Sequence, residues 1–131
     1  MNILILGSSG KIGFKISEYL NQYSNYNTTL HNYKNLLKSL KKNITIKAFD
    51  VTKVDNVMLD SINKTDIIIN CIGNYSKNKK MKLVNELFIK NLFNDHLEYF
   101  INKPIHWIQI SSIGIYDNTL RVNNINEKSN I

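Results

Sequence analysis

Apolar residues occur in short runs that alternate with segments of helical spacing. Residues 3–6 form a continuous apolar run that ends in glycine, which predicts a strand buried on both faces. Ile12, Ile16 and Leu20 then recur at helical spacing and predict a helix. Further strands are expected at residues 28–31, 44–49, 66–73 and 105–110, and further helices at residues 36–40, 54–62 and 81–101. Five strands that alternate with four helices predict βαβ units and a parallel sheet, hence an α/β fold.

The chain length of 131 residues suffices for one domain with a core and leaves no room for a second domain. We expect that domain to span residues 1–117. Residues 118–131 are polar, show no periodicity and are expected to form a tail.

The formal net charge of +7 raises the question of nucleic-acid binding. Arg121 is the only arginine, and proteins that read bases usually use arginine, so no nucleic-acid partner is expected. Cys71 is the only cysteine, which excludes an internal disulfide and fits a reducing compartment. The first apolar run is too short for a signal peptide or membrane span. We therefore expect a cytoplasmic protein without a membrane partner.

A glycine-rich turn follows the first strand and precedes the first helix, in the pattern Gly7-x-x-Gly10-x-x-Gly13. Gly7 permits a tight turn, Gly10 lets the main chain approach phosphates, and Gly13 lets the helix pack closely on the sheet. A phosphate-binding P-loop needs different spacing, and Ile12 follows Lys11 where that motif has Ser or Thr. Cofactor contacts are expected from Gly7, Ser9, Gly10, Lys11, Ile12 and Gly13, with Ser8 as a further hydroxyl.

This spacing resembles that of the extended short-chain dehydrogenases/reductases, the NAD-dependent epimerase/dehydratase family, and later segments agree in order. Phe49-Asp50-Val51-Thr52 is similar to a family segment that follows the third strand. The resemblance implies that Asp50 bonds the adenine amino group and that the main chain of Val51 meets the ring. The alternative is that Asp50 or Thr52 caps the next helix.

Two further segments extend the resemblance. Residues 69–73, after the fourth strand, resemble a stretch whose main chain passes the cofactor, which implies contacts from Cys71, Ile72 and Gly73. We expect Cys71 to be structural rather than nucleophilic, because no activating partner is evident. Residues 85–93 resemble a family helix that carries a structural asparagine, here Asn85.

The most specific match is Ser111-Ser112-x-x-x-Tyr116 after the fifth strand. The resemblance implies that Ser112 is the catalytic, substrate-orienting serine and that Ser111 and Tyr116 shape the substrate pocket. The alternative is that the serines cap the end of the strand. Residues 126–129 resemble the stretch that comes next in the family, but no Tyr-x-x-x-Lys follows Ser112 within the chain. Tyr75 and Lys79 have that spacing but precede the serine strand, so we interpret them as a coincidence.

The resemblance implies a Rossmann-type doubly wound sheet that is incomplete relative to the family. It implies an NAD(P)-binding domain of a nucleotide-sugar epimerase, dehydratase or reductase, truncated and inactive alone. The alternatives are a non-catalytic dinucleotide-binding regulator or accessory subunit and a basic nucleic-acid-binding domain. The fifth strand is expected at an unprotected sheet edge, which favours a homo-oligomer.

The residues around the end of the second strand favour NADP slightly over NAD as the cofactor. The end of the second strand has no acidic residue for the ribose hydroxyls, whereas His31 and Lys34 are placed to meet a 2′-phosphate. The alternatives are a surface position for His31 and a solvated Lys34. The basic loop with Lys77, Lys79, Lys80 and Lys82 is expected to be solvated rather than to bind a nucleotide.

Overall fold

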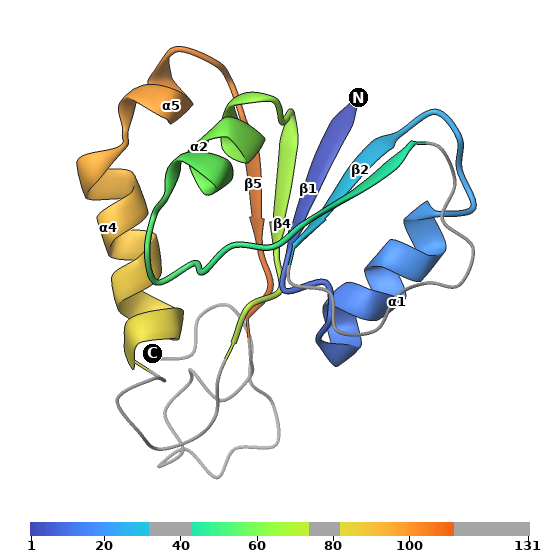
Figure 1. The fold of residues 1–131 in the computed structure, drawn as a ribbon, viewed down its shortest axis with the longest axis horizontal. Coiled ribbons are helices and arrows are strands. Elements are labelled where there is room, and N and C mark those ends of the chain that lie inside the picture. Colours follow the sequence, from blue (N-terminus) through green and yellow to red (C-terminus); the bar gives the residue numbers. More distant parts are fainter. Residues whose placement is uncertain (32–42, 74–81, 112–131) are drawn as a thin grey trace, which may run out of the picture.

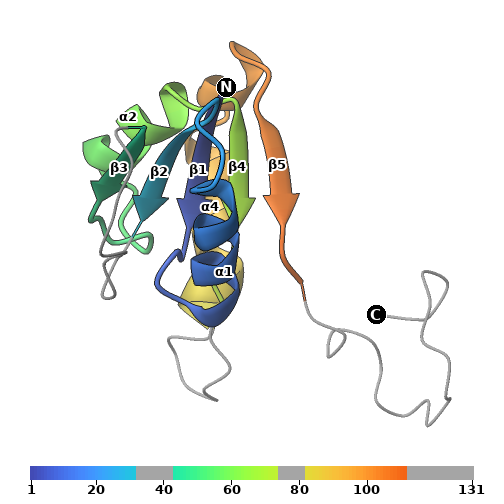
Figure 2. The same cartoon turned by 90° about the vertical axis from the view of Figure 1, so that its right-hand side faces the viewer.

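Five parallel strands form the centre of the molecule. The computed structural model describes residues 1–31, 43–73 and 82–111. Its sheet has the order β3-β2-β1-β4-β5, and every neighbouring pair is parallel. The strands are β1 (Asn2–Leu6), β2 (Asn27–His31), β3 (Ile44–Lys47), β4 (Ile67–Asn70) and β5 (His106–Gln109). Figure 2 shows all five arrowheads at one edge of the sheet. The predicted α/β architecture is confirmed.

Helices cover both faces of this sheet. Helix α1 (Lys11–Leu20) lies on one face, and α2 (Asn56–Asn63), α4 (Phe88–Asp95) and α5 (Glu98–Ile101) lie on the other (Figure 1). A short π-helical segment, η1 (Leu83–Leu87), leads into α4. The order of elements is that of a doubly wound sheet, in which ligands bind beyond the carboxyl ends of the strands.

Alternate residues of each central strand face opposite sides of the sheet, and both sides are apolar. Leu4, Leu6 and Ile68 pack toward α2 and α4, while Ile3 and Ile5 pack toward α1. The four residues from Ile3 to Leu6 are at most 4% exposed. This double burial explains why the run lacks polar alternation and sets β1 in the middle of the sheet.

The prediction of one long helix over residues 81–101 is wrong. Helix α4 ends at Asp95, His96 leaves the helical region with φ −136° and ψ 31°, and α5 starts at Glu98. The break brings the ring of Phe100 to 4.6 Å from that of Phe93 and 6.2 Å from that of Trp107, measured between centroids. Aromatic packing across the sheet edge thus stabilises an interruption that helical periodicity alone does not show.

Strand β3 is shorter than the sequence interpretation predicts. Strand β3 ends at Lys47, two residues before the predicted end, and the ring of Phe49 stacks on that of His31 at 4.1 Å. The helix predicted at residues 36–40 lies outside the described residues. None of the helices in the described ranges is both long and apolar enough to cross a membrane.

Candidate functional site

The glycine turn connects β1 to α1 at the carboxyl edge of the sheet. Gly7 has a φ of +75°, which residues with a side chain rarely adopt. The Gly10 N–H donates to the Gly7 carbonyl over 3.0 Å and closes the turn. A methyl group on Gly13 would lie 2.4 Å from the Gly7 carbonyl oxygen. The first turn of α1 therefore packs directly on main chain, as the glycine spacing predicts.

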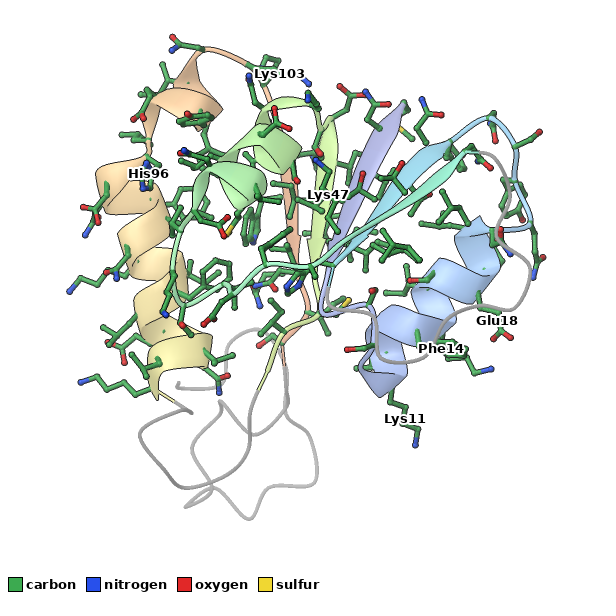
Figure 3. All side chains as sticks on the ribbon, in the orientation of Figure 1. Lys11, Phe14, Glu18, Lys47, His96 and Lys103 are labelled. Carbon is green, nitrogen blue, oxygen red and sulfur yellow. The ribbon has the colours of Figure 1, made fainter. Side chains whose placement is uncertain are left out.

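The start of α1 has no side-chain cap. Gly10 occupies the N-cap position with an extended main chain, and glycine has no side chain that can accept from the first helical N–H groups. In contrast, Asp55 caps α2 by accepting from the Met58 N–H over 2.9 Å. Lys11 and Ile12 are exposed at this end, and Lys11 extends away from the ribbon in Figure 3. Uncapped N–H groups and the helix dipole favour an anion here.

Two serines of the turn have different environments. The Ser8 side chain is buried, and its hydroxyl donates to the His31 carbonyl over 2.8 Å. The Ser8 N–H donates to the same carbonyl over 3.2 Å. The expectation that the Ser8 hydroxyl contacts phosphate is therefore wrong, because this hydroxyl already donates its hydrogen to the His31 carbonyl at the end of β2. Ser9 is only partly buried and remains a candidate for phosphate contact.

The imidazole of His31 is enclosed between the turn and the end of β3. Its Nδ1 accepts from the Gly7 N–H over 3.2 Å, and its Nε2 lies 2.8 Å from the Phe49 carbonyl oxygen. His31 is 2% exposed, so the interpretation as a surface residue is wrong. Burial lowers the pKa of His31 below its ordinary value of 6.5, against smaller opposing effects of the Phe49 carbonyl and the Asp50 charge. The prediction that this ring meets a 2′-phosphate is not retained, because both nitrogens already bond main-chain groups.

Asp50 lies in an exposed turn after β3. Its Oδ1 accepts from the Thr52 N–H over 3.0 Å and from the Thr52 hydroxyl over 2.7 Å. These bonds lower the pKa of Asp50, so its carboxylate is charged at neutral pH. Since Asp55 caps α2, the alternative that Asp50 or Thr52 caps that helix is wrong. Val51, the next residue, is buried in the core on the α2 side of the sheet.

The end of β4 lies against the glycine turn. A methyl group on Gly7 would be 3.0 Å from the Ile72 side chain and 3.1 Å from the Ile72 nitrogen. Cys71 is half-buried, and burial raises the pKa of its thiol, which fits the expected structural role. Gly73 is exposed, and no atom lies within 4 Å of the position that a Cβ would occupy there. The predicted site segments, which follow the carboxyl ends of β1, β2, β3 and β4, thus lie together at the carboxyl edge of the sheet.

A polar network at the same edge was not predicted from the sequence. Asn70 is 1% exposed; its amide nitrogen donates to Gln109 Oε1 over 2.9 Å, and its Oδ1 accepts from the Ile72 N–H over 3.1 Å. The Trp107 indole also donates to Gln109 Oε1, over 3.3 Å. Asn70 therefore fixes the main chain as it leaves β4. The sequence offered one signal for this network: Asn70 and Gln109 are polar residues at the ends of two apolar strands.

The substrate side of the predicted site is only partly described. Ser111 follows β5 and is exposed. The predicted catalytic Ser112 and the pocket residue Tyr116 lie outside the described residues, as do Tyr75 and several predicted basic residues, namely Lys34, Lys77, Lys79 and Lys80.

Tyr99 and Lys103 also have the spacing Tyr-x-x-x-Lys, which the sequence interpretation overlooked. Lys103 donates to the Thr65 carbonyl over 2.8 Å and lies 3.2 Å from Asp66 Oδ1, at the start of β4. This is the edge of the sheet opposite the glycine turn, as the label of Lys103 shows in Figure 3. The pair is therefore not placed to act on a ligand at the turn. Among the described side chains, no cluster of three or more His, Cys, Asp or Glu residues suits a metal ion.

The fold and the turn define a class of protein. A parallel 3-2-1-4-5 sheet with a glycine turn on an uncapped helix is a Rossmann-type dinucleotide-binding domain. Residues 3–90 match the family model described as the saccharopine dehydrogenase NADP binding domain. The chain belongs to this family and is an NAD(P)-binding domain. No curated protein sequence matches the chain.

Solved structures share the fold at low sequence identity. The oxidoreductase ylbE from Lactococcus lactis has a TM-score of 0.69 and 21% identity, over 95% of this chain and 54% of its own. UDP-glucuronic acid 4-epimerase from Bacillus cereus, solved with NAD, has a TM-score of 0.70 and 19% identity, over 88% and 41%. A short-chain dehydrogenase/reductase from Saccharomyces cerevisiae has a TM-score of 0.68 and 18% identity, over 86% and 53%.

These similarities confirm the predicted likeness to short-chain dehydrogenases and epimerases at the level of the fold. The family model adds a different family of dinucleotide-binding domains, which the sequence interpretation did not name. The chain spans about half the length of the three solved structures, from 41% to 54%.

Proposed function

We propose that the chain binds NADP or NAD with the pyrophosphate at the glycine turn. The single observation that carries the proposal is the uncapped start of α1, held directly on the turn by the close approach of Gly13 to Gly7. The N–H groups of Lys11 and Ile12 and the Ser9 hydroxyl are the proposed phosphate contacts. Gly10, whose own N–H closes the turn, lets the main chain approach the phosphates. The lysine ammonium adds positive charge beside the phosphates.

The adenine end of the cofactor is proposed to lie over the turn after β3. Asp50 accepts there from the adenine amino group, and the Val51 main chain meets the ring. The support is an exposed, charged carboxylate whose bonds to Thr52 hold it in place. The main chain from Cys71 to Gly73 passes the ribose and phosphates, supported by the contact of Ile72 with the turn.

NADP is the proposed preferred cofactor. The described end of β2 presents no carboxylate, and the matched family is an NADP-binding domain. With both nitrogens of His31 bonded in the fold, Lys34 is the remaining predicted partner of a 2′-phosphate.

A nucleotide-sugar is the proposed substrate of the complete active site, with Ser112 orienting it and Ser111 and Tyr116 shaping the pocket. Similarity to a UDP-glucuronic acid 4-epimerase supports this choice of substrate class. We propose that the 131-residue chain alone does not turn over a substrate. No Tyr-x-x-x-Lys follows Ser112, and Lys103 is hydrogen-bonded at the edge of the sheet opposite the glycine turn. A non-catalytic dinucleotide-binding regulator or accessory subunit is the alternative.

The outer edge of β5 is the proposed contact with a second copy of the chain. Within the described residues no strand lies beyond β5, and Ile108 is 37% exposed there. An open apolar edge favours pairing with another strand. Light scattering of the purified protein, compared with the variant Ile108→Lys, tests this contact.

Calorimetric titration with NADP(H) and NAD(H) tests the central proposal. Saturable binding of one equivalent, tighter for NADP(H), supports it. The absence of binding by a folded chain contradicts it. Assays of hydride transfer and of UDP-sugar epimerisation then separate an active enzyme from a binding module.

A further inference from the structure

The end of β2 holds the glycine turn through more than one bond. The His31 ring accepts from the Gly7 N–H, and the His31 carbonyl accepts from both the N–H and the hydroxyl of Ser8. A single residue therefore fixes the two positions that precede the proposed phosphate contacts. Gly7 is also the turn residue with positive φ, and its carbonyl accepts from Gly10.

The same geometry sets the protonation state of the ring. The Phe49 carbonyl can only accept, so Nε2, 2.8 Å from its oxygen, carries a hydrogen. The Gly7 N–H can only donate, so Nδ1 carries none. His31 is therefore neutral, with its hydrogen on Nε2.

Protonation disrupts this arrangement at the turn. A hydrogen on Nδ1 would point at the Gly7 N–H and oppose two donors across 3.2 Å. Either the ring or the Gly7 peptide must then move. Because the Gly7 carbonyl accepts from the N–H of Gly10, the N-cap of α1, a displaced Gly7 peptide also displaces the N–H groups proposed to bind pyrophosphate.

We infer that His31 is a positioning residue whose neutral ring holds the turn in its binding conformation, so that its protonation weakens dinucleotide binding. This inference rests on the proposed function. The charged group that acts on the ring is Asp50, beyond Phe49; it favours protonation, whereas burial opposes it more strongly. The adjoining turn residues Gly7 and Ser8 have no ionisable side chain.

The experiment measures the dissociation constant of NADP from pH 8 to pH 5 for the wild-type chain and for His31→Asn, which keeps an acceptor near Nδ1 and does not titrate. The wild type is expected to lose about tenfold more affinity than His31→Asn over this range. The variant comparison is needed because the 2′-phosphate itself titrates near pH 6. His106→Asn, at the exposed start of β5, is the matched control and should keep the wild-type profile.

A second measurement keeps the inference testable if His31→Asn does not fold. Binding and protonation are reciprocal, so a tenfold coupling must lower the pKa of His31 by about one unit when NADP binds. NMR titration of the wild-type histidine rings, with and without NADP, reads this shift. Parallel pH profiles for wild type and His31→Asn, or an unchanged His31 pKa, overturn the inference. If the folded wild type binds no dinucleotide at pH 8, the proposed function itself fails.

Discussion

Replacing Gly13 by alanine tests whether α1 packs on the turn as described. The added methyl would lie 2.4 Å from the Gly7 carbonyl oxygen and 2.9 Å from both the Gly7 carbonyl carbon and Ser8 Cα. Non-bonded carbon atoms prefer separations of about 3.5 to 4.0 Å, so α1 must move away by roughly 1 Å. All three obstructing atoms belong to the main chain, which cannot rotate away as a side chain can.

The expected magnitude follows from two opposing effects. Overpacking costs about 1 to 3 kcal/mol, and rigid main chain places this site near the upper end. Alanine recovers about 1 kcal/mol through its helix propensity relative to glycine. The net loss is about 2 kcal/mol, which lowers the Tm by roughly 6 to 8 °C in a domain of this size. Displaced N–H groups should also weaken NADP binding by about ten- to a hundredfold, the loss of one charge-assisted hydrogen bond.

Thermal unfolding and calorimetric titration measure these effects. Gly73→Ala is the control for stability, because nothing lies within 4 Å of an added methyl there. Glu18→Gln is the control for affinity, since Glu18 is exposed on α1 and pairs with Lys15. A Gly13→Ala variant that keeps both the wild-type Tm and the wild-type affinity would refute the described packing of helix on turn.

Three further predictions concern stability. Asp55→Ala removes the cap of α2 and should cost about 1 kcal/mol in urea unfolding, while Asp55→Asn, which keeps an acceptor, should cost less. Leu92→Ala opens a cavity in the buried core and should cost about 2 to 5 kcal/mol, whereas Leu97→Ala at the exposed break after α4 should change stability by under about 0.5 kcal/mol. Because the folded chain holds His31 neutral and the unfolded chain does not, stability should be full above about pH 6.5 and fall at lower pH, by up to about 1.4 kcal/mol per pH unit. Urea unfolding at pH 7.5 and 5.5 measures this change in the free energy of unfolding. If His31→Asn shows the same change as the wild type, the pH dependence does not come from His31.

Much of the fold follows from local patterns. Residues 3–6 are apolar without alternation because β1 is buried on both faces, and the parallel sheet was expected from the alternation of strands and helices. The positions of Gly7 and Gly13 were also predictable, because only glycine tolerates a positive φ at the first and the absence of a Cβ at the second. Helix 81–101 was misjudged because its break depends on ring contacts with β5, which periodicity does not record.

The sequence by itself therefore determined the α/β class and the place of the glycine turn, since both depend on residues close together in the chain. Only the tertiary structure decided the role of His31, which bonds Gly7 and Phe49 across 24 and 18 residues, and of Asn70, which bonds Gln109 across 39. Such bonds form where parallel strands end side by side, and neither partner carries a local signal of the other. The sequence shows that His31 carries an imidazole. Whether this ring is protonated, and whether its nitrogens are free to bind a ligand, depends on the main chain of Gly7 and Phe49, which lie far from it in the sequence.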